Sequence, residues 1–292
     1  MTIVISMWSP AAVIEAITLR SLTPMQFTAW CTVFGSFALF LTALATGKTG
    51  KLLSYTFHDH LKLLILSLLG FGGYQTLKYT AYTMVPIPQA NILQYSYPVF
   101  IVIFAMPVLK QPITMTKIIS IVMGFTGAVI ILSGGSLVTI EWDYLGGYTI
   151  ALCAGASFGL FSTFAAKASF ESLSFMFFLQ LYSAVIIIFM LFLTGSLAFP
   201  ATMTEIEGVF YAGVIANVIG VILLISAQQL TNDVSYISGS LYLVPFLSLY
   251  AFRIFLDYPI PFYAFMGLIF IVGGMVYHTI RSHAKMNATN SI

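Results

Sequence analysis

Long apolar stretches separated by short polar segments make up almost all of this chain of 292 residues. Each stretch is continuous and about 20 residues long, which allows a helix to cross a hydrocarbon core of about 30 Å. Continuous runs indicate helices and argue against an outer-membrane barrel, whose strands alternate between apolar and polar residues. The pattern predicts ten transmembrane helices, over residues 3–19, 24–46, 63–83, 88–109, 114–133, 145–167, 172–195, 208–231, 235–256 and 261–280.

The composition agrees with a polytopic membrane protein. Hydrophobic residues make up 60% of the chain and charged residues only 7%, whereas an ordinary soluble domain contains about 25% charged residues. Cys31 and Cys153 fall within apolar helices, where free thiols are expected. No polar segment is long enough for a soluble domain, and residues 282–292 are expected to form a frayed cytoplasmic tail. The net charge of +2 gives no indication of nucleic-acid binding.

The second half of the chain repeats the first. Residues 90–132 align with residues 237–279 at a single offset of 147 positions. Matches of proline and glycine carry more weight than matches of leucine, because each of these two residues imposes its own backbone behaviour. The repeat therefore predicts a duplicated unit with shared structural positions. The matched pairs are Pro98 with Pro245, Pro112 with Pro259, and Gly127 with Gly274.

The positive residues predict the topology. With the N-terminus inside, most Lys and Arg residues fall in the inner loops and the tail, as their preference for the cytoplasmic side requires. Each copy then contains five helices, within residues 1–134 and 144–281, and an odd number of helices inverts the second copy. Lys110, inside, aligns with Asp257, outside. We therefore predict an all-helical membrane protein with two inverted five-helix repeats and cytoplasmic termini.

The first predicted helix is short. Trp8 aligns with Phe158 in the repeat, but only seven residues precede Trp8 in the chain. A tilted or thinly covered helix explains this, and so does a start codon placed too late. The stretch lacks the basic start of a secretory signal and ends in Arg20, so we interpret it as a retained helix.

Polar residues share one face of the helix predicted over residues 88–109. Inverted repeats commonly place a substrate site near the midplane, where the two copies meet. A face with an amide and a phenol is costly to expose to lipid, so it is expected to face inward. Hydrogen bonding between helices with a packing kink is the alternative to a cavity-lining role. The residues are Asn91, Gln94, Tyr95 and Pro98, with Ser238, Tyr242 and Pro245 at the equivalent positions of residues 235–256.

Two charged residues lie well inside predicted helices. Lys78 is in residues 63–83, with Tyr74 and Tyr82 at four-residue spacing and Tyr79 beside it. A charge in hydrocarbon needs a partner, a hydrated cavity or a snorkelling route. Glu15 lies at a matching depth of the first helix. We expect Glu15 and Lys78 to pair near the outer mouth of a cavity, or Glu15 to exchange a proton during transport.

Other polar residues have simpler interpretations. Asn217 is a further cavity candidate, because its helix corresponds to that of Lys78 in the repeat, although a hydrogen bond between helices explains it almost as well. Arg253 and Asp257 are four residues apart at the outer end of a helix and predict a surface ion pair. Residues 58–60, His-Asp-His, lack further ligands nearby and indicate a solvated loop rather than a metal site. We find no phosphate-binding loop and no H-E-x-x-H motif, and expect no cofactor.

Taken together, these features resemble the EamA family of the drug/metabolite transporter superfamily. The resemblance covers nearly the whole chain, and it implies a central cavity between the repeats and alternating access by rocking of helix groups. It also implies export of amino acids or related metabolites as the commonest activity. Lys110 departs from the family pattern, which often has Glu there. The residues that carry the resemblance are Trp8 between Met7 and Ser9, Pro98 and Pro245, and the late glycines Gly127 and Gly274.

The sequence thus predicts a bacterial inner-membrane transporter of small organic solutes, most simply an amino-acid exporter, working as a monomer or homodimer in the lipid bilayer. A substrate carboxylate against Lys78 is the sharpest form of this hypothesis. Uptake or exchange of a nucleotide-type metabolite such as S-adenosylmethionine is the alternative. A membrane-embedded enzyme or lipid-handling protein is the weakest alternative, because an enzyme would need converging acid and base groups and the sequence lacks them. The expected substrate-binding residues are Trp8, Glu15, Tyr74, Lys78, Tyr79, Asn91, Gln94, Tyr95, Phe158, Asn217, Ser238 and Tyr242.

Overall fold

The computed structural model describes residues 2–52, 54–110, 112–134, 142–168, 170–223 and 243–290, and this part of the chain is helical without strands. The first half contains α1 (Thr2–Trp8), α2 (Ala11–Thr18), α3 (Pro24–Ala45), α4 (Thr49–Leu52), α5 (Phe57–Ser67), η1 (Leu68–Tyr74), α6 (Gln75–Met84), α7 (Ile87–Gln94), α8 (Tyr97–Val108) and α9 (Met115–Leu132). The second half contains η2 (Trp142–Tyr144), α10 (Leu145–Ala165), α11 (Ser172–Leu193), α12 (Met203–Phe210), η3 (Tyr211–Gly220), α15 (Val244–Leu256) and α16 (Phe262–Asn290).

Seven helices within the described ranges are long and apolar enough to cross a membrane. They run over Pro24–Ala45, Ile87–Val108, Met115–Leu132, Leu145–Ala165, Ser172–Leu193, Met203–Leu223 and Phe262–Arg281. Two shorter apolar helices cover Thr2–Thr18 and Val244–Leu256. Consecutive helical turns of α5, η1 and α6 cover the remaining predicted helix, residues 63–83. The prediction of an all-helical membrane protein is therefore confirmed.

Two of the predicted helices are broken at a proline, where single helices were expected. Pro10 separates α1 from α2, and the helix predicted over residues 88–109 divides into α7 and α8 at Tyr95 and Ser96. Pro98 is the second residue of α8, has no N–H to donate to the Gln94 carbonyl, and its ring would clash there. Asn91 and Gln94 therefore lie on α7 and Pro98 on α8, on either side of this break.

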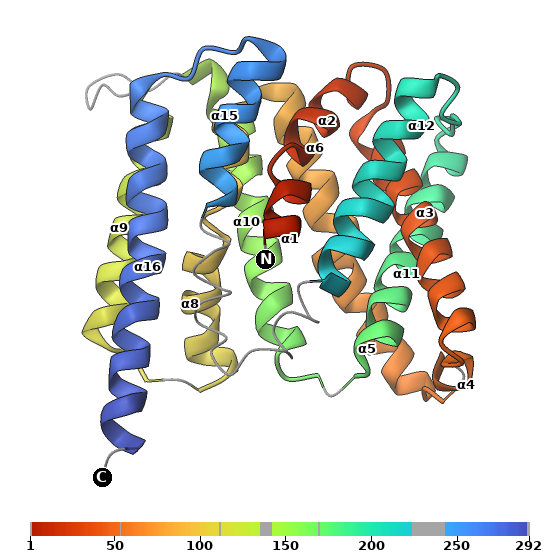
Figure 1. Ribbon diagram of the computed structural model, residues 1–292, viewed down its shortest axis with the longest axis horizontal. Helices are drawn as coiled ribbons and strands as arrows, with labels where there is room; N and C mark the ends of the chain where they lie inside the picture. Colours follow the sequence, from red (N-terminus) through yellow and green to blue (C-terminus); the bar gives the residue numbers. More distant parts are fainter. Residues whose placement is uncertain are drawn as a thin grey trace.

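Helix ends also differ from the prediction where polar caps extend a helix beyond its apolar stretch. The helix expected from residue 63 begins at Phe57, after a capping box between Thr56 and Asp59. The one expected from residue 208 begins at Met203, after an equivalent box between Thr202 and Glu205. At the other end of the chain, α16 continues through the expected frayed tail to Asn290, and Figure 1 shows it extending below the bundle. A capping box bonds the free backbone N–H groups at the start of a helix, and the hydropathy pattern contains no information about it.

The helices form one bundle in which α9 and α16 lie side by side at one end and α3, α11 and α12 at the other (Figure 1). Glycines allow the close approach of α9 and α16. A Cβ on Gly127 would lie 2.5 Å from the Gly267 carbonyl oxygen, and one on Gly274 would lie 2.8 Å from the Ser120 carbonyl oxygen. Gly127 and Gly274, predicted to be structural, therefore lie at the same helix interface.

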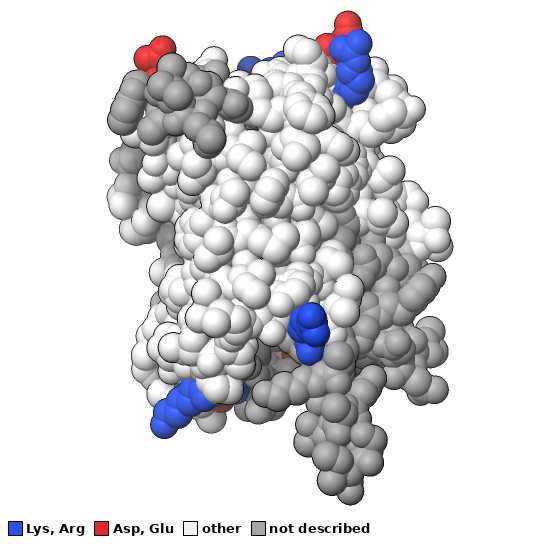
Figure 2. Space-filling view, turned by 90° about the vertical axis from the view of Figure 1, so that its left-hand side faces the viewer, with Lys and Arg blue, Asp and Glu red and all other residues white. Residues whose placement is uncertain are grey.

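The surface of this bundle is apolar between two charged ends. Figure 2 shows the face at the α9 and α16 end, where Lys, Arg, Asp and Glu appear only toward the top and bottom. Exposed side chains between them, such as Val122, Val129 and Ile269, are hydrophobic, as a lipid-facing surface requires. The predicted surface pair is also confirmed, because Arg253 and Asp257 are exposed and lie 3.0 Å apart.

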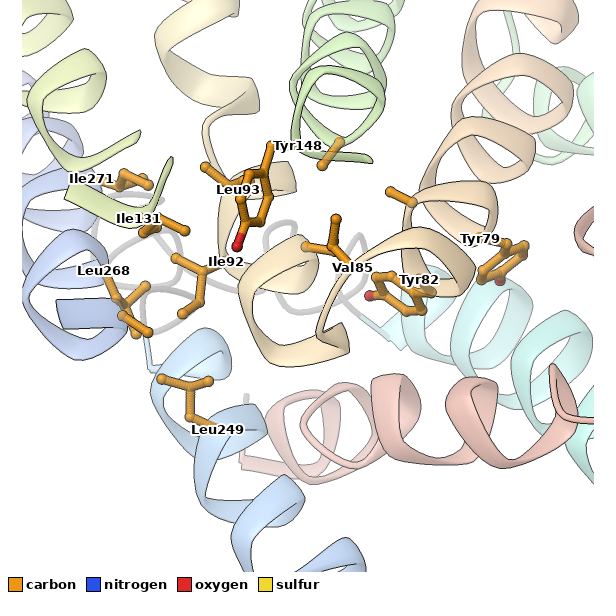
Figure 3. Close-up of a cluster of buried hydrophobic side chains, with 14 of the residues drawn as sticks. Tyr79, Tyr82, Val85, Ile92, Leu93, Ile131, Tyr148, Leu249, Leu268 and Ile271 are labelled. Atoms are coloured by element: carbon orange, nitrogen blue, oxygen red, sulfur yellow. The ribbon is translucent and has the colours of Figure 1, made fainter. Parts of the chain in front are cut away.

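The largest buried cluster joins the two ends of the bundle through its centre. Figure 3 shows it passing from Ile131 of α9 and Ile271 of α16, through Ile92 and Leu93 of α7, to Tyr82 of α6. The short helix α7 is thus packed against both halves of the chain. Its polar side chains, which lie on the same eight residues, are buried with it.

Candidate functional site

A buried ion pair joins α2 to α6. Lys78 Nζ lies 2.8 Å from Glu15 Oε1, and the two side chains are only 10% and 8% exposed. The hydroxyl of Tyr79 donates a second hydrogen bond to Glu15 Oε1 at 3.2 Å. The predicted pairing of Glu15 with Lys78 is therefore confirmed. Snorkelling does not describe this lysine, because its ammonium is directed into protein.

Three tyrosine rings surround the ammonium of Lys78. The distances from Nζ to the ring centroids are 4.3 Å for Tyr79, 5.8 Å for Tyr74 and 6.0 Å for Tyr82. The negative faces of such rings attract a cation, and the attraction is stronger where water is excluded. Four-residue spacing places Tyr74 and Tyr82 on the side of the helix that carries Lys78, and Tyr79 is the adjacent residue in the chain. The arrangement is suited to hold a positive charge away from water.

A network of amides and phenols lies next to the ion pair. Tyr82 donates to Asn91 Oδ1 at 2.8 Å, and the Gln94 amide donates to the same oxygen at 2.6 Å and to the Tyr82 hydroxyl at 2.9 Å. Tyr74 donates to Gln94 Oε1 at 2.9 Å. The Asn91 amide in turn donates to Ser248 of α15 at 2.9 Å. Buried polar groups thus connect η1, α6 and α7 of the first half with α15 of the second.

The break between α7 and α8 fits against a glycine of α10. A Cβ on Gly155 would lie 2.9 Å from Ser96 Oγ and 3.3 Å from the Gln94 carbonyl oxygen, so only glycine allows this approach. Ser96 Oγ is buried and has no hydrogen-bond partner among the described residues. In a membrane, backbone that leaves the helical pattern is tolerated where protein covers it. Gly155 provides that cover beside the polar network.

Trp8 and Asn217 form a second group, apart from the ion pair. The Trp8 indole donates to the Ala216 carbonyl oxygen in η3 at 3.0 Å, and Tyr211 donates to the Met7 carbonyl oxygen at 2.7 Å. Asn217, the neighbour of Ala216, is half-buried. A π-helical segment such as η3 is often found at functional sites. The broken first helix is therefore held against η3 by hydrogen bonds.

The remaining predicted residues lie in different places. Phe158 of α10 packs on Tyr74 with ring centroids 4.8 Å apart and on Tyr97 at 5.0 Å, which joins it to the polar network. Tyr95 directly follows the last residue of α7 and lies beside Tyr97, with 6.4 Å between the ring centroids. Ser238 and Tyr242 lie outside the described residues. The structure thus gathers Glu15, Tyr74, Lys78, Tyr79, Asn91, Gln94 and Phe158 in one region.

Comparison with known proteins identifies the first half of this architecture. A family model described as the EamA-like transporter family matches residues 1–133. The first 133 residues are therefore similar to the EamA-like transporter family. Among solved structures, one titled only as a crystal structure of a protein matches with a TM-score of 0.67 and 18% identity, over 96% of each chain, which shows a shared fold. No match was found among the curated proteins.

The match over residues 1–133 supports a membrane transporter of small solutes. A pocket of about 370 Å³ borders its polar network. Tyr82 contributes to both, because it lines the pocket and also hydrogen-bonds to Asn91. Its volume lies at the lower end of the range of about 300–1,000 Å³ for ligand pockets, but it is an open depression rather than an enclosed cavity. The other lining residues are Thr83, Met84, Val85, Pro86, Ile87, Tyr144 and Tyr258.

Sequence reasoning missed two parts of this site. Ser248 is a polar residue in an apolar helix, but a serine there usually bonds its own backbone, so its partner Asn91 could not be inferred. Gln89 was also missed: it accepts from Tyr148 and donates to Tyr263 at 2.7 Å. Its position on α7, two residues before Asn91, was the available signal, since amides inside a transmembrane helix normally face protein.

Proposed function

We propose that this protein is a multi-pass transporter of the bacterial inner membrane that carries an amino acid or amino-acid-like solute by alternating access. The observation that carries the proposal is the buried Glu15–Lys78 pair beside a polar network that reaches from α6 and α7 to α15. Ionisable residues inside a membrane are costly and mark pathways for substrates or ions by default. The polar network beside them joins the two halves through Asn91 and Ser248, and the meeting of the copies is where an inverted repeat is expected to place its site.

Three paired features support a ten-helix inverted repeat. Lys110 and Asp257, which align in the sequence, both adopt left-handed backbone conformations, with φ of 52° and 47°. Pro98 and Pro245 are each the second residue of their helix, α8 and α15. The π-helical segments η1 and η3 also occupy corresponding helices of the two halves. Such backbone conformations are uncommon, so their recurrence at equivalent positions favours duplication over coincidence.

Charged contacts support the proposed topology. Lys48 pairs with Glu171 at 3.2 Å, which joins two loops that the positive residues assign to the cytoplasmic side. Arg253 and Asp257 pair at the end of α15, which the same reasoning assigns to the outside. Labelling of single cysteines introduced at Lys48 and Asp257, with a reagent that does not cross membranes, tests the assignment. Equal labelling of both positions from one side of intact cells would contradict it.

In the proposed site, Lys78 takes the substrate carboxylate and the side chains of Asn91 and Gln94 orient its polar end. Tyr74, Tyr79, Tyr95 and Phe158 provide aromatic walls, and Trp8 and Asn217 line the region next to η3. Ser238 and Tyr242 are proposed to face the same cavity from the second half. Two copies of the chain are not required, because both halves of the site come from one polypeptide.

Counterflow in proteoliposomes tests the function. Purified protein is reconstituted with an unlabelled solute inside, and entry of the labelled solute is followed for a panel of amino acids and for S-adenosylmethionine. We expect counterflow for at least one amino acid and none with protein-free vesicles. Counterflow of S-adenosylmethionine alone would favour the nucleotide-type alternative. A deletion strain and its complemented parent then give the direction of flux in cells.

A further inference from the structure

The Glu15–Lys78 pair differs from the other ion pairs of the described residues in being buried on both sides. The side chains of the Lys48–Glu171 pair are 45% and 25% exposed, and those of Arg253 and Asp257 are more exposed still. Lys117 and Glu205 are buried as well, but each lies at a helix end and bonds to backbone groups. The site therefore contains one positive and one negative charge that neutralise each other.

This pairing is a costly way to hold α2 against α6. Removing two charges from water is expensive, and a well-packed apolar pair of similar volume is often as stable or more stable. The side chains that bond next to the pair are neutral amides, phenols and hydroxyls, so the charges of the described residues in this region balance. A neutral site whose charges satisfy each other needs a substrate that preserves this balance when the pair opens.

We propose that the Glu15–Lys78 pair opens to admit a zwitterionic substrate, whose ammonium pairs with Glu15 while its carboxylate pairs with Lys78. This inference rests on the proposed function and specifies the net charge of what is carried. A zwitterion replaces one buried ion pair by two and leaves no charge unpaired. An anion would leave Glu15 without a cation, and a cation would leave Lys78 without an anion, which is strongly unfavourable in a buried site.

Tyr79 contacts both members of the ion pair. Its hydroxyl donates to Glu15, and its ring lies 4.3 Å from the Lys78 ammonium. A substrate ammonium bound to Glu15 would therefore also meet an aromatic surface that favours cations. Tyr82 lies on the same helix, carries its ring 6.0 Å from the Lys78 ammonium and also lines an open depression at the protein surface.

Matched sets of solutes test the charge rule. Each amino acid of the panel is compared with its 2-hydroxy acid, which lacks the ammonium, and its amide, which lacks the carboxylate. We expect the wild-type protein to carry the amino acid at least about tenfold faster than either analogue, since a polar site rejects analogues that leave its groups unpaired. Glu15→Gln is expected to shift the preference toward the 2-hydroxy acid, and Lys78→Met toward the amide.

Two double variants cover the case in which the single variants do not fold. Glu15→Lys combined with Lys78→Glu keeps one charge of each sign, so the preference for the amino acid is expected to persist. Glu15→Gln combined with Lys78→Met removes both charges, so the preference is expected to disappear. Lys48→Met, which breaks the exposed pair, is the matched control and leaves the preference unchanged. Gel filtration in detergent verifies that each variant is monodisperse.

The outcomes separate this inference from the proposed function. Counterflow of an amino acid with its analogues carried at similar rates by the wild-type protein overturns the charge rule and leaves transport standing. An unchanged preference in the uncharged double variant also overturns it. Absence of counterflow for every solute overturns the proposed function, and the charge rule falls with it.

Discussion

Lys78→Met gives the most direct physical test of the buried pair. Glu15 Oε1 has two donors, Lys78 Nζ at 2.8 Å and the Tyr79 hydroxyl at 3.2 Å. The substitution keeps a side chain of similar length but leaves the carboxylate with one phenol in a region that is almost inaccessible to water. Breaking a buried pair by removing one partner costs about 3–5 kcal/mol. Since stability is typically about 5–15 kcal/mol, the free energy of unfolding is expected to fall by a large fraction.

Removing Glu15 together with Lys78 is expected to recover part of the stability that either single substitution loses. Glu15→Gln alone leaves the ammonium unpaired and is expected to cost a similar amount. Glu15→Gln combined with Lys78→Met leaves no buried charge, and the Tyr79 hydroxyl keeps an amide oxygen as its acceptor. The double variant is therefore expected to be more stable than either single variant, because the two costs come from the same interaction.

Reversible unfolding of the four proteins in mixed micelles measures these differences as a double-mutant cycle. Additive losses, with the double variant the least stable, would refute the reasoning, because they would mean that Glu15 and Lys78 are stabilised separately. The matched control is the exposed pair, for which Lys48→Met is expected to cost no more than about 1 kcal/mol. A loss of several kcal/mol there would show that the assay does not distinguish buried from exposed pairs.

Three further predictions concern other parts of the molecule. Gly127→Ala places a methyl group within 2.5 Å of a carbonyl oxygen of α16, and is expected to destabilise the protein by about 1–3 kcal/mol in thermal unfolding. Tyr82→Phe removes the hydroxyl shared by Asn91 and Gln94, and counterflow is expected to slow by about tenfold, or about 1.4 kcal/mol. Burial acts to raise the pKa of the Glu171 carboxyl, but hydrogen bonds from the Ser174 backbone and side chain and from Lys48 outweigh it and lower that pKa. The stabilisation of the folded state by the Glu171 carboxylate is therefore fully present above its pKa in the unfolded chain, about 4.3, and is lost as pH falls through its lower pKa in the folded protein. Glu171→Gln is expected to abolish this pH dependence in acid unfolding.

Two of these predictions have a control variant in the same chain. Gly50→Ala adds a methyl group where nothing lies within 4 Å, and is expected to be neutral or stabilising. Tyr250→Phe removes the hydroxyl of an exposed tyrosine and leaves counterflow unchanged. For Glu171, an acid-unfolding profile that is identical in the wild type and the variant would contradict the assigned hydrogen bonds. Equal effects of Gly127→Ala and Gly50→Ala would contradict the close contact of α9 with α16.

The sequence predicted the helices best where an apolar stretch ends at a polar residue. The ends of α9, α10 and α11 lie within two residues of the prediction. The breaks at Pro10 and Pro98 were not predicted, because hydropathy is the same on both sides of each proline. A proline in a transmembrane helix also has two outcomes, a kink or an interruption, and neighbouring helices decide between them. Gly155, which covers one break, lies on α10, 57 residues after Pro98 in the chain.

The part of the site that the sequence predicts is the ion pair, because a charged side chain inside a membrane helix requires a partner. Glu15 and Lys78 could be paired from sequence, since each is a charged residue well inside an apolar stretch and their depths match. Asn91 and Gln94 were recognised as polar groups facing protein, but their partners depend on the packing of α7 against α6 and α15. Contacts of this kind follow from tertiary structure, and a single sequence contains no periodic signal for them.

The interruptions of the helices and the buried polar groups coincide, and this coincidence strengthens the proposal of a moving site. Glu15 lies five residues after the break at Pro10, Lys78 follows the π-helical segment η1, and Gln94 ends α7. In lipid, irregular backbone is confined to places where protein or a water-filled cavity surrounds it. Helix termini and breaks also absorb large changes of backbone angles in domain motions. The elements that hold the charges are therefore the ones best able to move them apart, which a rigid structural ion pair would not require.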